Sequence, residues 1–140
     1  MNLYLDTSGL VKLYAHEPES FAVRRQVAAS QHIAISRVGY AEARAALARR
    51  SREGTTRPSQ LRRAVARLDA DWRALVVVEV DAALVAAAGE LAERRALRGF
   101  DAIHLASALR FGGALSAPVT FLAFDAHLSQ AARAEGLTVG

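Results

Sequence analysis

The stretch LYLDTSGLVKLY, residues 3–14, contains the pattern from which the fold can be predicted. Residues 2–5 form a short apolar run that predicts a buried strand, and the polar segment 6–9 turns the chain into a helix over about 7–15. Asp6 therefore lies at the exit of the first predicted strand. A strand that leads directly into a helix is typical of α/β proteins.

The same alternation of strand and helix continues along the chain. Further strands are predicted at about 32–35, 75–80, 119–124 and 137–139. Helices are predicted at about 20–30, with Ser20 as its cap, then at 37–52, after the loop GTTRP to about 72, at 81–95, at 100–111 and from Asp125.

Strands separated by helices imply right-handed crossovers and a parallel sheet covered by helices on both faces. We therefore expect an α/β fold of three layers, α/β/α, with a central parallel sheet of four to five strands in the doubly wound order 3-2-1-4-5. The chain shows no repeat and no linker, so residues 1–140 are expected to form a single domain.

The composition limits the chemistry that the chain can carry. Cysteine is absent, which excludes disulfides and thiolate metal sites and leaves oxygen or imidazole ligands for any metal. The net charge of +4 comes almost wholly from arginine, which suits a polyanionic partner but also a merely solvated basic surface. No signal peptide or membrane span is indicated, and a cytoplasmic location is expected.

Four carboxylates are the candidate site. Asp6 and Asp125 follow the first and fourth strands, which are neighbours in the expected order, and ligands of such sheets bind beyond the carboxyl ends of the strands. Glu42 lies on an apolar stripe of its helix, and Asp101 opens the apolar helix DAIHLASAL. Gathered acids repel each other unless a divalent cation holds them ionised.

Each acid also has a structural alternative. Asp6, Asp101 and Asp125 each stand where an aspartate can cap a helix. Glu42 could instead form an internal ion pair with a nearby arginine such as Arg49. His104, three residues after Asp101, is expected to be a buried structural histidine rather than a metal ligand.

Four separated blocks carry a resemblance to a known family: LYLDTSGLVKLY, YAEARAALARR, LRGFDAIHLASAL and VTFLAFDAHLSQAA followed by EGL. They resemble the PIN-domain ribonucleases, specifically the VapC-type toxins of toxin–antitoxin pairs, and the likeness covers nearly the whole chain. The resemblance implies an acidic pocket that binds Mg²⁺ or Mn²⁺ and hydrolyses RNA phosphodiesters.

The resemblance also implies roles for individual residues. Asp6 and Asp101 would bind the metal directly, with Glu42 and Asp125 acting through water, and Ser8 would support the first acid. Where relatives commonly carry threonine or serine two residues before the last acid, this chain has Ala123, so one hydroxyl contact near the metal is expected to be missing. The implied partners are an RNA substrate, a VapB-type antitoxin and a second copy in a homodimer.

An arginine-rich segment is the candidate track for the RNA backbone. Eight arginines lie between residues 44 and 67, opposed there only by Glu53, and Arg44, Arg49 and Arg50 are the residues we single out. The alternative is a solvated helical hairpin in which Arg49 and Arg50 simply favour a helix C-terminus.

Three rival functions remain at this stage. A phosphatase with a strand-end aspartate nucleophile is disfavoured, because haloacid-dehalogenase relatives place a second aspartate where this chain has Ser8. A PIN-type nuclease outside a toxin pair and a non-catalytic module that binds RNA or protein are the other two, and metal-dependent RNA cleavage separates the last from an enzyme.

Overall fold

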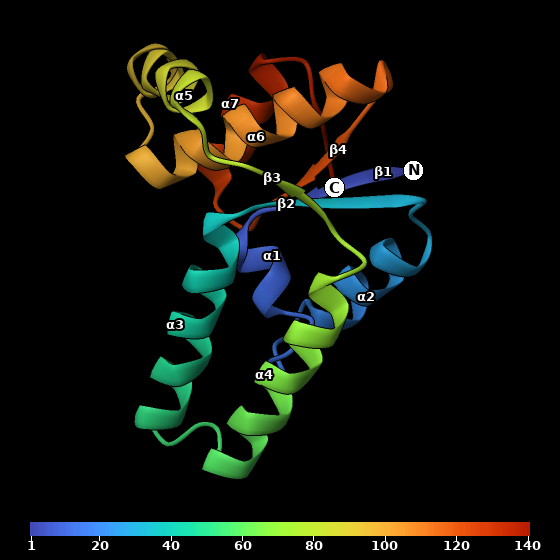
Figure 1. Ribbon diagram of the computed structural model, residues 1–140, viewed down its shortest axis with the longest axis vertical. Helices are drawn as coiled ribbons and strands as arrows, with labels where there is room; N and C mark the ends of the chain where they lie inside the picture. Colours follow the sequence, from blue (N-terminus) through green and yellow to red (C-terminus); the bar gives the residue numbers. More distant parts are fainter.

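Five parallel strands form the centre of the protein in the computed structural model, which describes residues 1–140 (Figure 1). The sheet has the order β3-β2-β1-β4-β5, and every neighbouring pair is parallel. The expected strand order is thus confirmed. The strands are β1 (Asn2–Leu5), β2 (His32–Ser36), β3 (Val76–Val78), β4 (Thr120–Leu122) and β5 (Thr138–Val139).

Helices cover both faces of the sheet, which confirms the three-layer α/β/α architecture (Figure 1). One face carries α1 (Thr7–Val11), α2 (Ser20–Ala28), α3 (Val38–Arg52) and α4 (Pro58–Trp72). The other face carries α5 (Ala82–Arg95), α6 (Gly99–Leu115) and α7 (Ala126–Ala134).

The two faces of the sheet have separate hydrophobic cores. Side chains alternate along a strand, so Tyr4 packs among α5, α6 and α7 while Leu3 and Leu5 pack among α1, α3 and α4. All three side chains are fully buried. This explains why the first strand is apolar at consecutive positions, as strands buried on both faces are.

Some element boundaries differ from the expectations. The first helix ends at Val11 rather than near residue 15. Ser20 does not cap α2: its buried hydroxyl accepts from the Glu17 N–H and donates to the Ala15 carbonyl, so it braces the preceding turn. Local sequence identified a residue with a backbone-binding hydroxyl but not the backbone groups that it meets.

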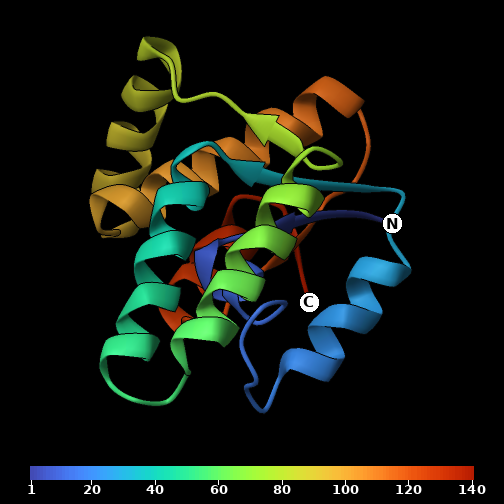
Figure 2. The same ribbon diagram turned by 60° about the horizontal axis from the view of Figure 1, so that its bottom comes forward.

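Helices α3 and α4 form a long antiparallel hairpin that extends away from the sheet (Figure 2). Gly54 ends the first helix with φ of 82°, a conformation that favours glycine. Pro58 starts the second helix, and the Gln60 side chain accepts from the Arg57 N–H at 2.9 Å. The turn therefore has the local chemistry that the sequence indicated.

Candidate active site

Asp6 lies where β1 ends and α1 begins. Its Oδ1 accepts from the Ser8 hydroxyl at 2.6 Å and from the Gly9 N–H at 3.0 Å, while Oδ2 accepts no hydrogen bond. The side chain is nearly buried, at 6% exposed. Asp6 thus caps the helix with one oxygen, as the structural alternative expected, and keeps the other oxygen free.

The end of β4 is held directly beside Asp6. The Asp6 N–H donates to the Leu122 carbonyl at 3.2 Å, and the Phe124 N–H donates to the Ser8 hydroxyl at 3.3 Å. A Cβ on Gly9 would come within 3.2 Å of the Leu122 carbonyl oxygen, so glycine permits this close approach of helix and strand. The convergence of the first and fourth strand ends follows from these contacts.

Glu42 reaches the same region from the first turns of α3. Its Oε1 accepts from the Thr7 hydroxyl at 2.6 Å and from His104 Nε2 at 2.8 Å. The side chain is 32% exposed, so it is partly rather than fully buried. The suggested ion pair with Arg49 is wrong, because Arg49 pairs with Glu53 at 3.2 Å.

Asp101 lies in the first turn of α6 but does not cap that helix. The helix begins at Gly99 with Arg98 at the capping position, so the capping alternative is wrong for this residue. Its carboxylate is 28% exposed, and its one salt bridge is to the Arg98 guanidinium at 3.5 Å. The carboxylate is therefore open to a further ligand.

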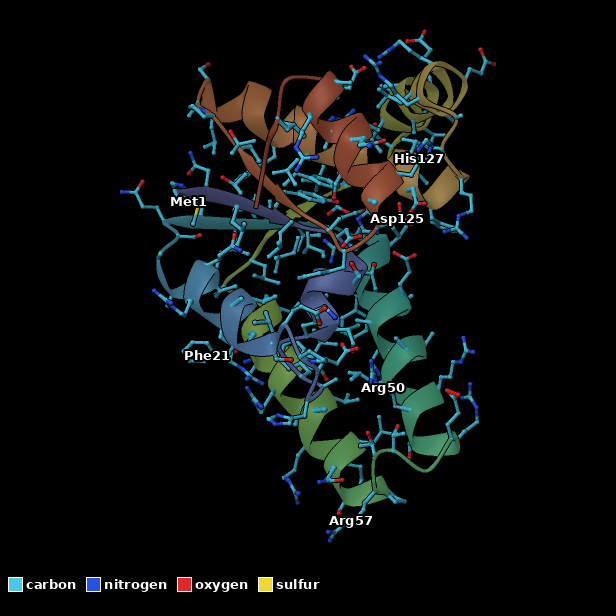
Figure 3. All side chains as sticks on the ribbon, turned by 180° about the vertical axis from the view of Figure 1, so that it is seen from behind. Met1, Phe21, Arg50, Arg57, Asp125 and His127 are labelled. Atoms are coloured by element: carbon cyan, nitrogen blue, oxygen red, sulfur yellow. The ribbon has the colours of Figure 1, made fainter.

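Asp125 caps α7 and lies on the surface. Its Oδ1 accepts from the Leu128 N–H at 2.8 Å, so here the capping role is real. Figure 3 shows Asp125 at the start of α7, whereas Arg57 lies at the far tip of the α3–α4 hairpin. Ala123 is buried just before this turn, and its carbonyl accepts from the Ser129 hydroxyl.

The carboxylates differ in their proton affinity. Burial raises the pKa of Asp6 more than its hydrogen bonds from Ser8 and Gly9 lower it, and the negative charge of Asp101 adds to the rise. Burial also acts to raise the pKa of Glu42, but hydrogen bonds from His104 and Thr7 outweigh it and leave that pKa below its usual value. The pKa of Asp6 is thus raised while that of Glu42 is lowered.

The donor set fits a hard divalent cation. In the structure no group of three or more acidic or histidine side chains is gathered closely enough to hold a metal ion alone. Magnesium, however, is usually bound by one or two carboxylates together with water and substrate phosphates. The Oδ2 of Asp6, which accepts no hydrogen bond, and the partly exposed carboxylate of Asp101 are the oxygens available for such a site.

The three arginines singled out for RNA have different surroundings. Arg44 donates to the Tyr40 hydroxyl at 2.9 Å and lies over that ring. Arg49 is 74% exposed beside Glu53, and Arg50, 30% exposed, is paired with Glu17. Arg50 is therefore the least accessible of the three to a phosphate.

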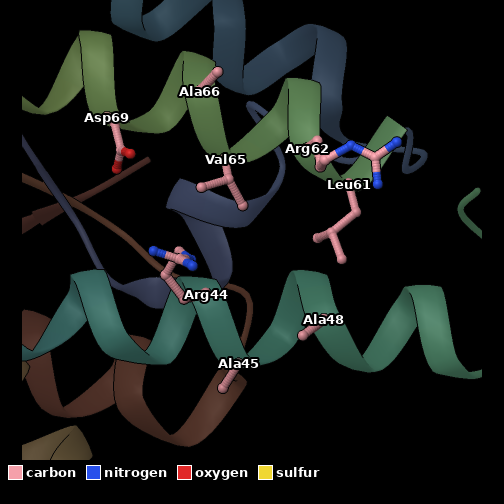
Figure 4. A pocket seen from close by; sticks show the side chains of 8 residues that line it. All are labelled: Arg44, Ala45, Ala48, Leu61, Arg62, Val65, Ala66 and Asp69. Atoms are coloured by element: carbon pink, nitrogen blue, oxygen red, sulfur yellow. The ribbon is translucent and has the colours of Figure 1, made fainter. Parts of the chain in front are cut away.

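A hollow on the surface is lined by none of the four acids. It has a volume of about 710 Å³ between α3 and α4, and Figure 4 shows its lining side chains. Those residues are Arg44, Ala45, Ala48, Leu61, Arg62, Val65, Ala66 and Asp69. Its floor is mostly apolar, which suits a protein surface better than a charged phosphate.

Sequence reasoning missed the two residues that hold Glu42. Ser8 alone was expected as a supporting hydroxyl, but the structure has two: Ser8 donates to Asp6, and Thr7 donates to Glu42. His104 is buried as expected, at 2% exposed, yet it also contacts Glu42. The spacing of His104 from Asp101 on one helix face was the available signal.

The family model of the PIN domain matches residues 3–138 of this chain. The chain therefore belongs to the PIN-domain family. Its relatives include ribonuclease VapC45 of Mycobacterium tuberculosis CDC 1551, which is 36% identical over 137 residues, 98% of this chain and 93% of the relative. Ribonuclease VapC46 of strain H37Rv is also 36% identical, over 98% of this chain and 95% of that protein.

Solved structures share the fold. VapC20 of M. tuberculosis, described as a sarcin-ricin loop cleaving toxin, has a TM-score of 0.70 at 21% identity and covers 98% of this chain and 97% of that one. VapBC2 of Rickettsia felis, bound to a DNA fragment from its promoter, has a TM-score of 0.63 at 18% identity, covering 100% and 98%. None of the helices in this chain has the length and apolar character that a membrane crossing requires.

Proposed function

We propose that this chain is a metal-dependent endoribonuclease and the toxin of a VapB–VapC-type pair. The observation that carries the proposal is the Oδ2 of Asp6, which accepts no hydrogen bond at the carboxyl edge of the sheet although the residue is only 6% exposed. The relatives named as VapC ribonucleases, at 36% identity over nearly the whole chain, support the same assignment.

Each acid has a role in this proposal. Asp6 and Asp101 bind Mg²⁺ or Mn²⁺, while Glu42 and Asp125 act through water. The cation, when bound, activates a water molecule and stabilises negative charge on the phosphate under attack. Ser8 and Gly9 hold Asp6 in one orientation, and Thr7 does the same for Glu42. Both supporting hydroxyls thus come from α1.

RNA approaches over the basic side of the molecule. Arg44 and Arg49 are exposed on α3, the helix that also carries Glu42, and they attract the phosphate backbone. Arg50 contributes only if RNA displaces Glu17 from it. The arginines therefore add affinity for RNA, and the acids carry out the chemistry.

The partners follow from the same assignment. We propose a VapB-type antitoxin, supported by the VapBC and FitAB complexes among the structures of this fold, and a homodimer. The site of action would be the cytoplasm. Copurification of the chain with the product of a neighbouring small reading frame would test the antitoxin, and light scattering would test the dimer.

Cleavage of a labelled structured RNA by the purified protein tests the enzymatic proposal. We expect cleavage with Mg²⁺ or Mn²⁺, none in excess chelator, and recovery when the metal is restored. Asp6→Asn should be inactive but folded, because asparagine keeps the capping oxygen. Cleavage that persists in chelator would contradict the proposed metal dependence. RNA binding without any cleavage would favour the alternative of a non-catalytic binding module.

A further inference from the structure

A line of hydrogen bonds runs from the core to Glu42. The hydroxyl of Tyr4 on β1 lies 2.8 Å from His104 Nδ1, and His104 Nε2 lies 2.8 Å from Glu42 Oε1. Tyr4 is fully buried and His104 is 2% exposed. The three residues are far apart in the sequence and come from β1, α6 and α3, so the line crosses the sheet from one helix layer to the other.

The chemistry of the groups gives this line a direction. A carboxylate only accepts, so His104 Nε2 donates to Glu42. In a neutral ring the other nitrogen, Nδ1, then accepts, and the Tyr4 hydroxyl is the group that donates to it. Glu42 thereby selects the Nε2–H tautomer of His104, and the hydroxyl of Tyr4 satisfies the opposite nitrogen and orients the ring.

The result at Glu42 is an asymmetric carboxylate. Oε1 accepts from both Thr7 and His104, while Oε2 accepts no hydrogen bond. Asp6 has the same arrangement, with two donors on Oδ1 and none on Oδ2. Both acids therefore have one oxygen fixed by the protein and the other available to a ligand.

Packing alone does not require these polar contacts. The Tyr4 ring stacks on Phe121 with centroids 5.5 Å apart and meets His104 edge-on at 6.0 Å, contacts that apolar rings would make equally well. Burying the polar atoms in addition is unfavourable unless they are all satisfied. Gly39, one turn before Glu42, has no Cβ to collide with Ile35 and so lets α3 approach this point closely.

We propose that His104, oriented by Tyr4, is a positioning residue that fixes Glu42 and leaves Oε2 as its ligand-facing oxygen. This inference rests on the proposed ribonuclease function. It assigns a task to a buried histidine that neither binds the metal nor touches RNA. The expected consequence is that polar changes inside the core alter the rate of cleavage without altering the affinity for RNA.

Tyr4→Phe is the sharpest test, because it removes only the hydroxyl and retains the ring stack on Phe121. We expect single-turnover cleavage to fall about 10-fold, as for other residues that orient ligands. RNA affinity, measured in chelator, should stay unchanged. Tyr14→Phe is the matched control, since it removes a hydroxyl bound to Asp71 elsewhere, and it should cleave at the wild-type rate.

Two variants of His104 separate positioning from packing. His104→Gln keeps an N–H donor and should retain more activity than His104→Leu, which keeps only bulk, while thermal unfolding confirms that each is folded. Equal activity of wild type, Tyr4→Phe and His104→Leu would overturn the inference. So would equal losses in the glutamine and leucine variants when both are folded.

A readout independent of cleavage comes from nitrogen-15 NMR of the histidine rings in metal-free protein. His104 should show the Nε2–H tautomer in the wild type, and its Nδ1 resonance should shift in Tyr4→Phe because the hydrogen bond from the hydroxyl is lost, with no such change in Tyr14→Phe. An Nδ1–H tautomer in the wild type would overturn the inference even in an active enzyme. Absence of cleavage with the expected tautomer present would instead contradict the proposed function.

Discussion

Asp6 and Glu42 at the carboxyl edge of the sheet have surroundings opposite to those of the carboxylates on the outer surface, although the third edge acid, Asp101, lies 3.5 Å from Arg98. On the outer surface Glu79 pairs with Arg37, Asp81 with Arg110, and Glu135 with both Arg94 and Arg95. At the sheet edge Asp6 and Glu42 accept from hydroxyls, a backbone N–H and an imidazole, and neither pairs with an arginine.

This difference is informative because cations are abundant in this chain. Lysine and arginine number 18 against 14 acids, so partners were available for every carboxylate. Asp6 nevertheless pairs with no arginine or lysine, and its burial raises its pKa. A bound divalent cation would stabilise the ionised form of Asp6, which is why we assign the edge to function and the outer pairs to stability.

The largest effect should come from neutralising one acid of each kind. Asp101→Asn is expected to lower RNA cleavage by a factor on the order of 1,000, because it removes a proposed metal ligand. Helix α6 should be unaffected, since Asp101 does not cap it. Glu79→Gln, which neutralises an acid of the outer surface, should cleave within about twofold of wild type. Similar losses of cleavage in Asp101→Asn and Glu79→Gln would contradict the distinction between edge acids and outer acids.

The next largest effect should be on thermal stability, measured without and with metal, when the edge acid Asp6 is neutralised. Burial raises the folded-state pKa of Asp6, so ionised Asp6 destabilises the protein above that pKa and not below its unfolded value. In chelator at neutral pH, Asp6→Asn should therefore unfold at a higher temperature than the wild type. In acid the two proteins should unfold at the same temperature.

Adding metal should reverse that order. At a metal concentration 100 times the dissociation constant, binding stabilises the wild type by about 2.7 kcal/mol and leaves Asp6→Asn unchanged. Differential scanning fluorimetry with Mn²⁺ measures both states. A variant that gains as much from the metal as the wild type would show that Asp6 is not a ligand.

The smallest effect should come from the outer pairs. Glu135→Gln removes hydrogen bonds from Arg94 at 3.1 Å and Arg95 at 2.7 Å, and we expect a loss of about 1 kcal/mol in unfolding free energy at pH 7. Those arginines, Arg94 first, hold the pKa of Glu135 below its usual value, so this stability disappears as pH falls through the folded pKa.

Urea unfolding at neutral and strongly acid pH checks this prediction. The wild type and Glu135→Gln should differ at neutral pH and converge in acid. Cleavage should be the same for both. A loss of cleavage on changing Glu135 would extend the functional region to the C-terminal end of α7 and contradict the assignment of the outer pairs to stability alone.

Much of the fold could be predicted because it depends on local patterns. Apolar runs of four to six residues, interrupted by segments such as DTSG, give the order of strands and helices, and the handedness of crossovers then limits the sheet order. The residues at which helices and strands end were harder to predict from the sequence. Helix α1 stops at Val11 and Ser20 braces a turn, because backbone partners in neighbouring loops decide these details.

The residues of the candidate site could be predicted from the sequence, but the contacts between them could not. The positions of Asp6 and Asp125 after strands follow from the sequence pattern, and Glu42 was singled out by the apolar stripe around it. Its supposed partner Arg49 was wrong because proximity along a helix was used in place of the packing between helices. The capping alternative for Asp101 was wrong because the predicted start of α6, residue 100, lies after the observed start at Gly99.

The sequence by itself determined which groups this protein brings to the end of its sheet, since the succession of strand, acid and helix is encoded within short segments. Only the tertiary structure decided how those groups are held. Glu42 meets Thr7 and His104 across 35 and 62 residues of chain, and His104 meets Tyr4 across 100. Such contacts depend on how α3 and α6 pack against opposite faces of β1, which no local pattern specifies.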